Sequence, residues 1–156
     1  MDKKEIIQSS KKSSLKLQNK DKPFTPSTVG MREIIEGKSS MTLQALRREQ
    51  NYKSARVFVT VWVVKLQETL EVKKKMGDDS ILMASDLILE DYYYLTGADL
   101  RLLFKRIVTG HYGVMYESLT IDKLMTYFSL YAKERWTEAE RISLENHNQF
   151  KNKYNG

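Results

Sequence analysis

The sequence feature that most constrains the fold is an unbroken run of β-branched and aromatic residues from Val57 to Val64. Such a run fits a buried strand as well as a buried helix, so its own periodicity does not decide between them. The flanks favour a helix, because the chain continues on both sides without glycine, proline or any other turn signal. Phe58, Trp62 and Leu66 then share one helix face. We therefore predict that residues 53–75 form the core helix, with Trp62 as its largest buried side chain.

Apolar residues at spacings of three and four predict four further helices. The composition agrees, because two prolines and seven glycines in 156 residues favour helices over a turn-rich β architecture. Ser39 or Ser40 is the expected N-cap of the first of these helices, and Asp78 or Asp79 is the expected N-cap of the second. The predicted ranges are 41–50, 79–93, 97–109 and 121–150. The expected fold class is all-α, a small bundle of about five helices with a disordered basic N-terminal arm.

Several helix ends carry recognisable signals. Thr96 and Asp99 are spaced as a capping box at the start of the helix 97–109. Gly110 suits the left-handed position after that helix, and Thr120 suits the N-cap of the last one. Lys73–Lys75 is predicted to end the core helix, where cations favour the helix dipole. The buried face of the helix 97–109 is expected to hold Leu100, Leu103, Phe104 and Ile107.

Residues 1–39 are predicted to form a flexible tail, because apolar residues are too sparse there to offset the entropy of ordering. A helical turn at Met31–Glu36 is the expected exception. The tail is either a solvated arm or an electrostatic arm that contacts phosphates, since seven lysines and three carboxylates lie in the first 22 residues. The helical domain is expected over 40–150, with a frayed end at 151–156. The lysines predicted to act electrostatically are Lys3, Lys4, Lys11, Lys12 and Lys16.

The composition argues against several classes of function. The chain has no cysteine, which excludes disulfides, cysteine zinc sites and thiol catalysis and suits a reducing cytoplasm. No apolar run approaches the roughly 20 residues that a membrane-spanning helix needs. His111 and His147 are far apart in sequence and lack the spacing of a metal site, and no phosphate loop or nucleophile motif occurs. We expect no catalytic residues, no metal, no cofactor and no membrane partner.

The best candidate binding surface is a cationic cluster at the end of the helix 97–109 and in the glycine-flanked loop after it. Its cations are predicted to face solvent beside exposed backbone N–H groups, where phosphate could be held. A solvated polar helix face is the alternative. If DNA binds, this cluster is expected to contribute more than the arm does. The candidate residues are Arg101, Lys105, Arg106, His111 and Tyr112.

The tyrosine triplet Tyr92–Tyr94 is a second candidate. Three neighbouring positions at a helix end point in three directions, so at least one ring is expected to be exposed. The triplet either packs at a corner between helices or supplies an aromatic anchor at an interface, where tyrosine is enriched. Tyr93 is the member we select as a candidate contact.

Within residues 72–135, the segments that carry a family resemblance are Val72–Met76, Leu87–Thr96, Asp99–Leu100, Phe104–Arg106, Gly110–Gly113, Tyr116–Glu117 and Tyr131–Arg135. In these segments the chain resembles a family of small, mostly uncharacterised proteins of phages and mobile elements in gut Bacteroidetes. The chain departs from the family after the glycine loop, where residues 116–121 read YESLTI.

The setting of that family implies DNA replication or maintenance of a mobile element in the host cytoplasm. The expected function is a non-enzymatic, helicase-loader-like adaptor that binds a replication protein, DNA or both. One alternative is a regulator with a helix-turn-helix-like corner formed by the helices 79–93 and 97–109. The other alternative is a protein-interaction or virion-associated protein that does not bind nucleic acid.

Overall fold

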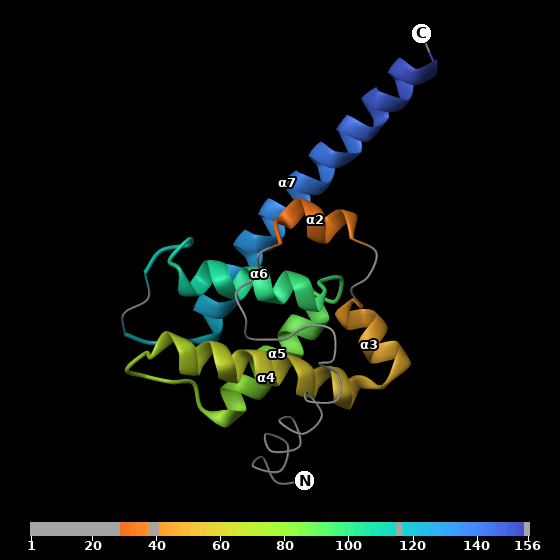
Figure 1. The fold of residues 1–156 in the computed structure, drawn as a ribbon. Helices are drawn as coiled ribbons and strands as arrows, with labels where there is room; N and C mark the ends of the chain where they lie inside the picture. Colours follow the sequence, from red (N-terminus) through yellow and green to blue (C-terminus); the bar gives the residue numbers. More distant parts are fainter. Residues whose placement is uncertain (1–28, 38–40, 115–116, 155–156) are drawn as a thin grey trace.

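The computed structural model describes residues 29–37, 41–114 and 117–154. Within these ranges the chain forms six helices and no β-strand, which confirms the predicted all-α bundle. Its β-type pairings in this part are two isolated bridges, Thr42 with Thr96 and Lys74 with Ser118. The helices (Figure 1) are α2 (Met31–Glu36), α3 (Leu43–Glu49), α4 (Tyr52–Leu70), α5 (Asp78–Asp91), α6 (Gly97–Val108) and α7 (Ile121–Tyr154).

The β-branched run lies in α4, the central helix of the bundle, so the helical interpretation is confirmed and the strand is wrong. Helix α4 packs against α3, α5 and α6, while α7 packs against α2, α5 and α6. Val59, Val63 and Leu66 are almost completely buried on α4. Trp62 is also buried, as predicted, and its ring meets Phe104 of α6 edge-on, with centroids 5.0 Å apart. This aromatic contact joins the two helices through the centre of the core.

Helix α4 ends at Leu70, five residues before the predicted end. Glu71 takes a left-handed conformation at φ 52°, and the chain then turns toward α5. Lys74 lies in this connection, where its backbone N–H donates to the Glu117 carbonyl oxygen at 2.9 Å. The prediction that Lys73–Lys75 stabilises the end of the core helix is therefore wrong, because these lysines follow the helix and do not belong to its last turn.

Two predicted N-caps differ in the structure. Helix α3 is capped by Thr42, whose hydroxyl oxygen accepts from the Ala45 N–H at 3.1 Å. The predicted caps Ser39 and Ser40 lie outside the described residues. Helix α5 begins after Gly77, and Asp78 and Asp79 lie in its first turn, where their charge favours the helix dipole. Helix α7 begins directly after Thr120, whose carbonyl oxygen accepts its first hydrogen bond, from Leu124 N–H at 3.0 Å.

Helix α2 belongs to the bundle, which moves the domain boundary. The predicted turn at Met31–Glu36 is present, and Met31 and Ile34 are buried in the core cluster. The Arg32 guanidinium also donates to Glu145 of α7 at 2.5 Å. The predicted tail of residues 1–39 therefore extends too far, because α2 packs on α7 through buried apolar side chains and an ion pair. Residues 1–28 lie outside the described residues.

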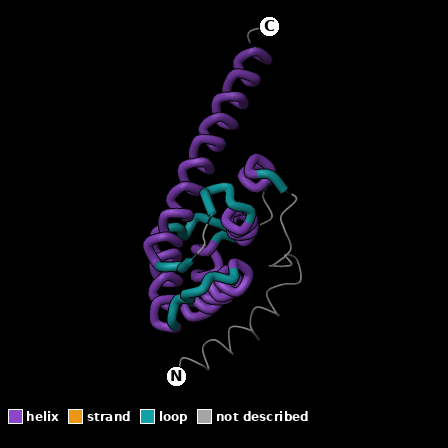
Figure 2. Tube along the Cα trace, turned by 90° about the vertical axis from the view of Figure 1, so that its left-hand side faces the viewer, coloured by secondary structure: helices purple, strands orange, loops and turns teal. Residues whose placement is uncertain are grey.

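Helix α7 extends well beyond the other helices (Figures 1 and 2). Its first half packs on the bundle through Leu124, Phe128 and Tyr131, which are fully buried as predicted. Further along, Ile142 is also buried, and α7 packs against α2. The helix then continues to Tyr154, so the frayed end predicted from residue 151 is wrong for 151–154. No helix among the described residues is both long and apolar enough to cross a membrane.

Candidate functional site

The start of α6 forms the predicted capping box. The Thr96 hydroxyl oxygen accepts from the Asp99 N–H at 3.2 Å, and Asp99 Oδ2 accepts from the Thr96 N–H at 2.9 Å. These two bonds satisfy N–H groups that have no partner within the helix. The signal was readable from sequence because all of its atoms lie within four consecutive residues.

Asp99 also has a role that the sequence did not reveal. It is fully buried, and its Oδ1 accepts from the Tyr131 hydroxyl at 2.7 Å and from Arg135 Nε at 2.9 Å. Burial, reinforced by the Asp99 charge, raises the pKa of Tyr131 far above its usual value, so the hydroxyl remains a donor. One carboxylate therefore caps α6 and joins it to α7. Tyr131 and Arg135 are four residues apart on one helix face, but this spacing does not predict a shared hydrogen-bond acceptor unless that acceptor is already known.

The cationic cluster is less exposed than predicted. Arg106 forms an ion pair with Glu134 of α7, and its side chain is only 22% exposed. His111 Nε2 lies 3.3 Å from the other carboxylate oxygen of Glu134. Lys105 is exposed, whereas Arg101 is half-buried. The structure thus brings Arg106 and His111 together around a carboxylate, and the prediction that all these cations face solvent is wrong.

The glycine loop after α6 is a turn whose backbone is internally bonded. Gly110 and Gly113 have φ values of 77° and 103°, which suit glycine alone without strain. The N–H groups of Gly110, His111 and Gly113 donate at 2.9–3.1 Å to the carbonyl oxygens of Ile107, Arg106 and Gly110 respectively. The prediction that these N–H groups are open to phosphate is wrong, because the turn uses them itself.

Tyr112 packs this loop against α7. Its ring centroid lies 5.9 Å from that of Tyr127 and 4.7 Å from the His111 ring. Burial is the largest cause that raises the pKa of Tyr112 to about 12, while the nearby Arg106 cation acts in the opposite direction. The side chain predicted as a contact therefore has a packing role between loop and helix.

One tyrosine of the triplet is packed against the bundle, and the other two are exposed. It lies in the connection between α5 and α6, because α5 ends at Asp91. Tyr92 is half-buried against Phe128, with centroids 5.2 Å apart. Tyr93 and Tyr94 are exposed and meet edge-on at 5.7 Å. Tyr93 is thus accessible, as the sequence predicted for at least one member.

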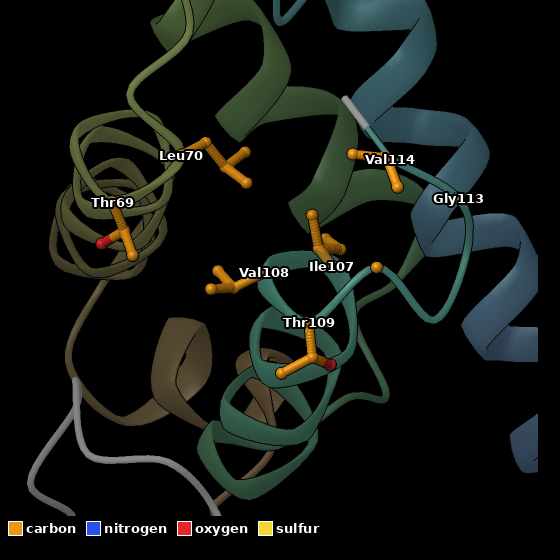
Figure 3. A pocket seen from close by; sticks show the side chains of 8 residues that line it. Thr69, Leu70, Ile107, Val108, Thr109, Gly113 and Val114 are labelled. Carbon is orange, nitrogen blue, oxygen red and sulfur yellow. The ribbon is translucent and has the colours of Figure 1, made fainter. Parts of the chain in front are cut away.

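Two hollows lie near the predicted cluster. The first is a small pocket of about 240 Å³ between the end of α4, the end of α6 and the glycine loop. Figure 3 shows Leu70, Ile107, Val108 and Val114 around it, and no charged side chain lines it. The second, which we call the Arg106 hollow, has a volume of about 430 Å³ and lies between α2, α6 and α7. Its lining residues are Met31, Arg106, Lys133, Glu134, Thr137 and Glu138.

The Arg106 hollow is the strongest candidate site in the described part of the chain. It joins the apolar Met31 side chain of α2 to charged side chains of both signs on α6 and α7. In the same part of the chain, no group of three or more histidine and acidic side chains is arranged to hold a metal ion. The tail lysines Lys3, Lys4, Lys11, Lys12 and Lys16 lie outside the described residues.

The chain matches no protein-family model, and comparisons with curated proteins and with solved structures found no match. The binding surface proposed below therefore rests on the geometry of the chain itself.

Proposed function

We propose that the protein is a non-enzymatic adaptor that binds a replication protein of a phage or mobile element through the Arg106 hollow. The sharing of Glu134 between Arg106 and His111 is the observation that carries this proposal. A carboxylate at the centre of the cluster repels phosphate, whereas a hollow of mixed charge beside an apolar side chain suits a protein surface. The replication setting is the one that the resemblance of residues 72–135 implies.

The start of α6 weighs against the helix-turn-helix alternative. In such proteins the first residues of the recognition helix contact base edges in the major groove. Here Thr96 and Asp99 are buried, and Gly97 and Ala98 are half-buried. A helix whose first turn is covered by its own domain has little surface to place in a groove.

A pull-down from a Bacteroidetes cell extract tests the proposal, with the full chain as bait because α2 belongs to the bundle. Lys133 is exposed and lines the hollow, so Lys133→Glu should reduce recovery of the replication protein at least fivefold, as charge reversal at an interface weakens binding. Lys75→Glu makes the same charge change on the α4–α5 connection and should leave recovery unchanged. Equal recovery with both variants, or recovery of no replication protein, would contradict the proposal.

A further inference from the structure

The projecting end of α7 carries large apolar side chains that its own chain does not cover. Trp136, Phe150 and Tyr154 are 69%, 62% and 70% exposed, and Leu144 is 64% exposed. Figure 2 shows the helix running past α2 and away from the other described helices. Exposed aromatic residues are a feature of interfaces, where tryptophan and tyrosine contribute much of the binding energy.

These side chains form a stripe that is distinct from the core face of α7. At about 100° of rotation per residue, Trp136, Phe150 and Tyr154 lie within about 40° of one line along the helix, together with the polar residues Glu140, Ser143 and His147, and Leu144 lies about 80° to one side of that line. The buried residue Ile142 lies about 120° away from that line by the same geometry. Spacings that alternate between four and three are those of a seam where two helices pair. The stripe therefore continues past the bundle as a separate surface.

We propose that the stripe pairs with the same stripe of a second copy of this chain, with the two α7 helices antiparallel. The charges beside the seam select this arrangement. Glu140 and Lys151 lie on the same side of the stripe, and both are exposed. An antiparallel pair brings the same flanks of the two stripes together, so each Glu140 lies beside Lys151 of the other copy. A parallel pair turns this flank toward the opposite flank of the partner, where Glu140 meets no Lys151. Charges that flank a seam set the orientation of paired helices in this way.

Side-chain size fits the same arrangement. When the two helices cross near residue 145, Trp136 lies opposite Tyr154 of the other copy. The small Ala139 lies opposite the large Phe150, so the bulky ring has room. Leu144 meets its own counterpart close to the twofold axis, as expected for a self-complementary interface. Each exposed apolar side chain of the stripe thus acquires an apolar or small neighbour.

The pairing leaves the bundle unobstructed. Helix α2 covers a different side of α7, where Arg32 binds Glu145 and Ile142 is buried. The paired segment of 19 residues is about 28 Å long, which suits a small interface and a dimer of micromolar affinity. This inference is independent of the partner proposed for the Arg106 hollow.

Sedimentation velocity of the full chain over a concentration series tests the pairing. We expect a reversible change from one chain to two, with a midpoint in the range of about 1–100 μM. Phe150→Asp should raise that midpoint at least about tenfold, since it places a charge in the seam. Gln149→Asp adds the same charge one residue away, on the opposite face of the helix, and should leave the midpoint unchanged. A wild-type chain that stays single at several hundred micromolar, or equal effects of the two variants, would overturn the proposal.

Charge exchange then tests the antiparallel orientation. Glu140→Lys alone and Lys151→Glu alone should each weaken the dimer, because each places like charges side by side across the seam. The double variant should recover the affinity of the wild type. In a parallel pair, neither single exchange would weaken the dimer in this way, because the flank that carries Glu140 and Lys151 then faces the opposite flank of the partner. Single variants with wild-type affinity, or a double variant as weak as the singles, would overturn the antiparallel arrangement.

Discussion

At the scale of single residues, Asp99 has the most demanding environment in the described chain. It is a fully buried carboxylate that accepts hydrogen bonds from the Thr96 N–H, the Tyr131 hydroxyl and Arg135. A buried charge is tolerated only when its partners compensate the loss of hydration. Because these partners come from both the start of α6 and the middle of α7, the residue couples a local cap to the packing of the longest helix.

Asp99→Ala is therefore expected to lower the free energy of unfolding by about 3–5 kcal/mol, since it leaves Tyr131 and Arg135 without their shared acceptor. Urea unfolding followed by circular dichroism measures this loss. Asp78→Ala is the matched control, because Asp78 also lies in the first turn of a helix but is exposed. It should cost less than about 1 kcal/mol. A loss below about 1 kcal/mol for Asp99→Ala would contradict the role assigned to it.

Asp99 shows which contacts of the site could be predicted from the sequence and which could not. The capping box of Thr96 and Asp99 was predictable, because its hydrogen bonds depend only on residues three apart. The bonds to Tyr131 and Arg135 span 32 and 36 residues, and no local pattern specifies them. The exposure of Arg106 was misjudged for the same reason, because its partner Glu134 lies on another helix.

At the scale of elements, the end of α4 shows how tertiary contacts override local helix signals. Neither glycine nor proline stops the helix at Leu70. Instead, the buried Gln67 side chain accepts from the Met76 N–H at 2.6 Å and donates to the Met76 carbonyl oxygen at 3.3 Å. Val72 is buried in the same connection. The predicted core helix had the right position and the wrong end, because the bonds that fold the chain back are not a property of its local sequence.

Gln67→Leu should test this account of the α4–α5 connection. The substitution replaces the amide by methyl groups and leaves the Met76 N–H and carbonyl groups buried without partners, at a cost of about 2–4 kcal/mol. Hydrogen exchange should show faster exchange of the Met76 amide, and guanidinium unfolding should show the lower stability. Glu68→Leu, at the neighbouring exposed position, is the control and should leave that amide protected. Unchanged exchange at Met76 in Gln67→Leu would contradict the account.

At the scale of the whole molecule, positive charge is unevenly distributed. The bundle pairs many of its cations with carboxylates, including Arg56 with Asp86 and Arg141 with Glu138. Most of the net charge of +6 arises in the first 22 residues, where lysines outnumber carboxylates by seven to three. The sequence alone favoured the cluster on α6 as the nucleic-acid contact. Because Arg106 is paired with Glu134, we now expect the tail lysines to contribute more to nucleic-acid binding than the cluster on α6 does.

Fluorescence anisotropy with single- and double-stranded DNA over a salt series tests the reversed ranking. Replacing Lys3, Lys4, Lys11, Lys12 and Lys16 by serine should weaken binding about tenfold or more at low salt and should flatten the salt dependence, because fewer counterions are released. The control replaces Arg101, Lys105 and Arg106 by alanine and should weaken binding less than about threefold. A larger effect of the α6 substitutions would restore the cluster as the contact. Absence of DNA binding at low salt would contradict a nucleic-acid role for the tail.

The projecting end of α7 also has an evolutionary consequence. Residues 146–154 are helical and exposed, so packing within the bundle places no restriction on their identity. If no partner required Phe150 and Tyr154, selection against aggregation would favour polar residues at these positions, because exposed rings favour aggregation. A comparison of related sequences should therefore show which exposed positions of α7 are retained. Aromatic residues that persist at positions 136, 150 and 154, while their neighbours drift, would be the mark of an external surface that requires them.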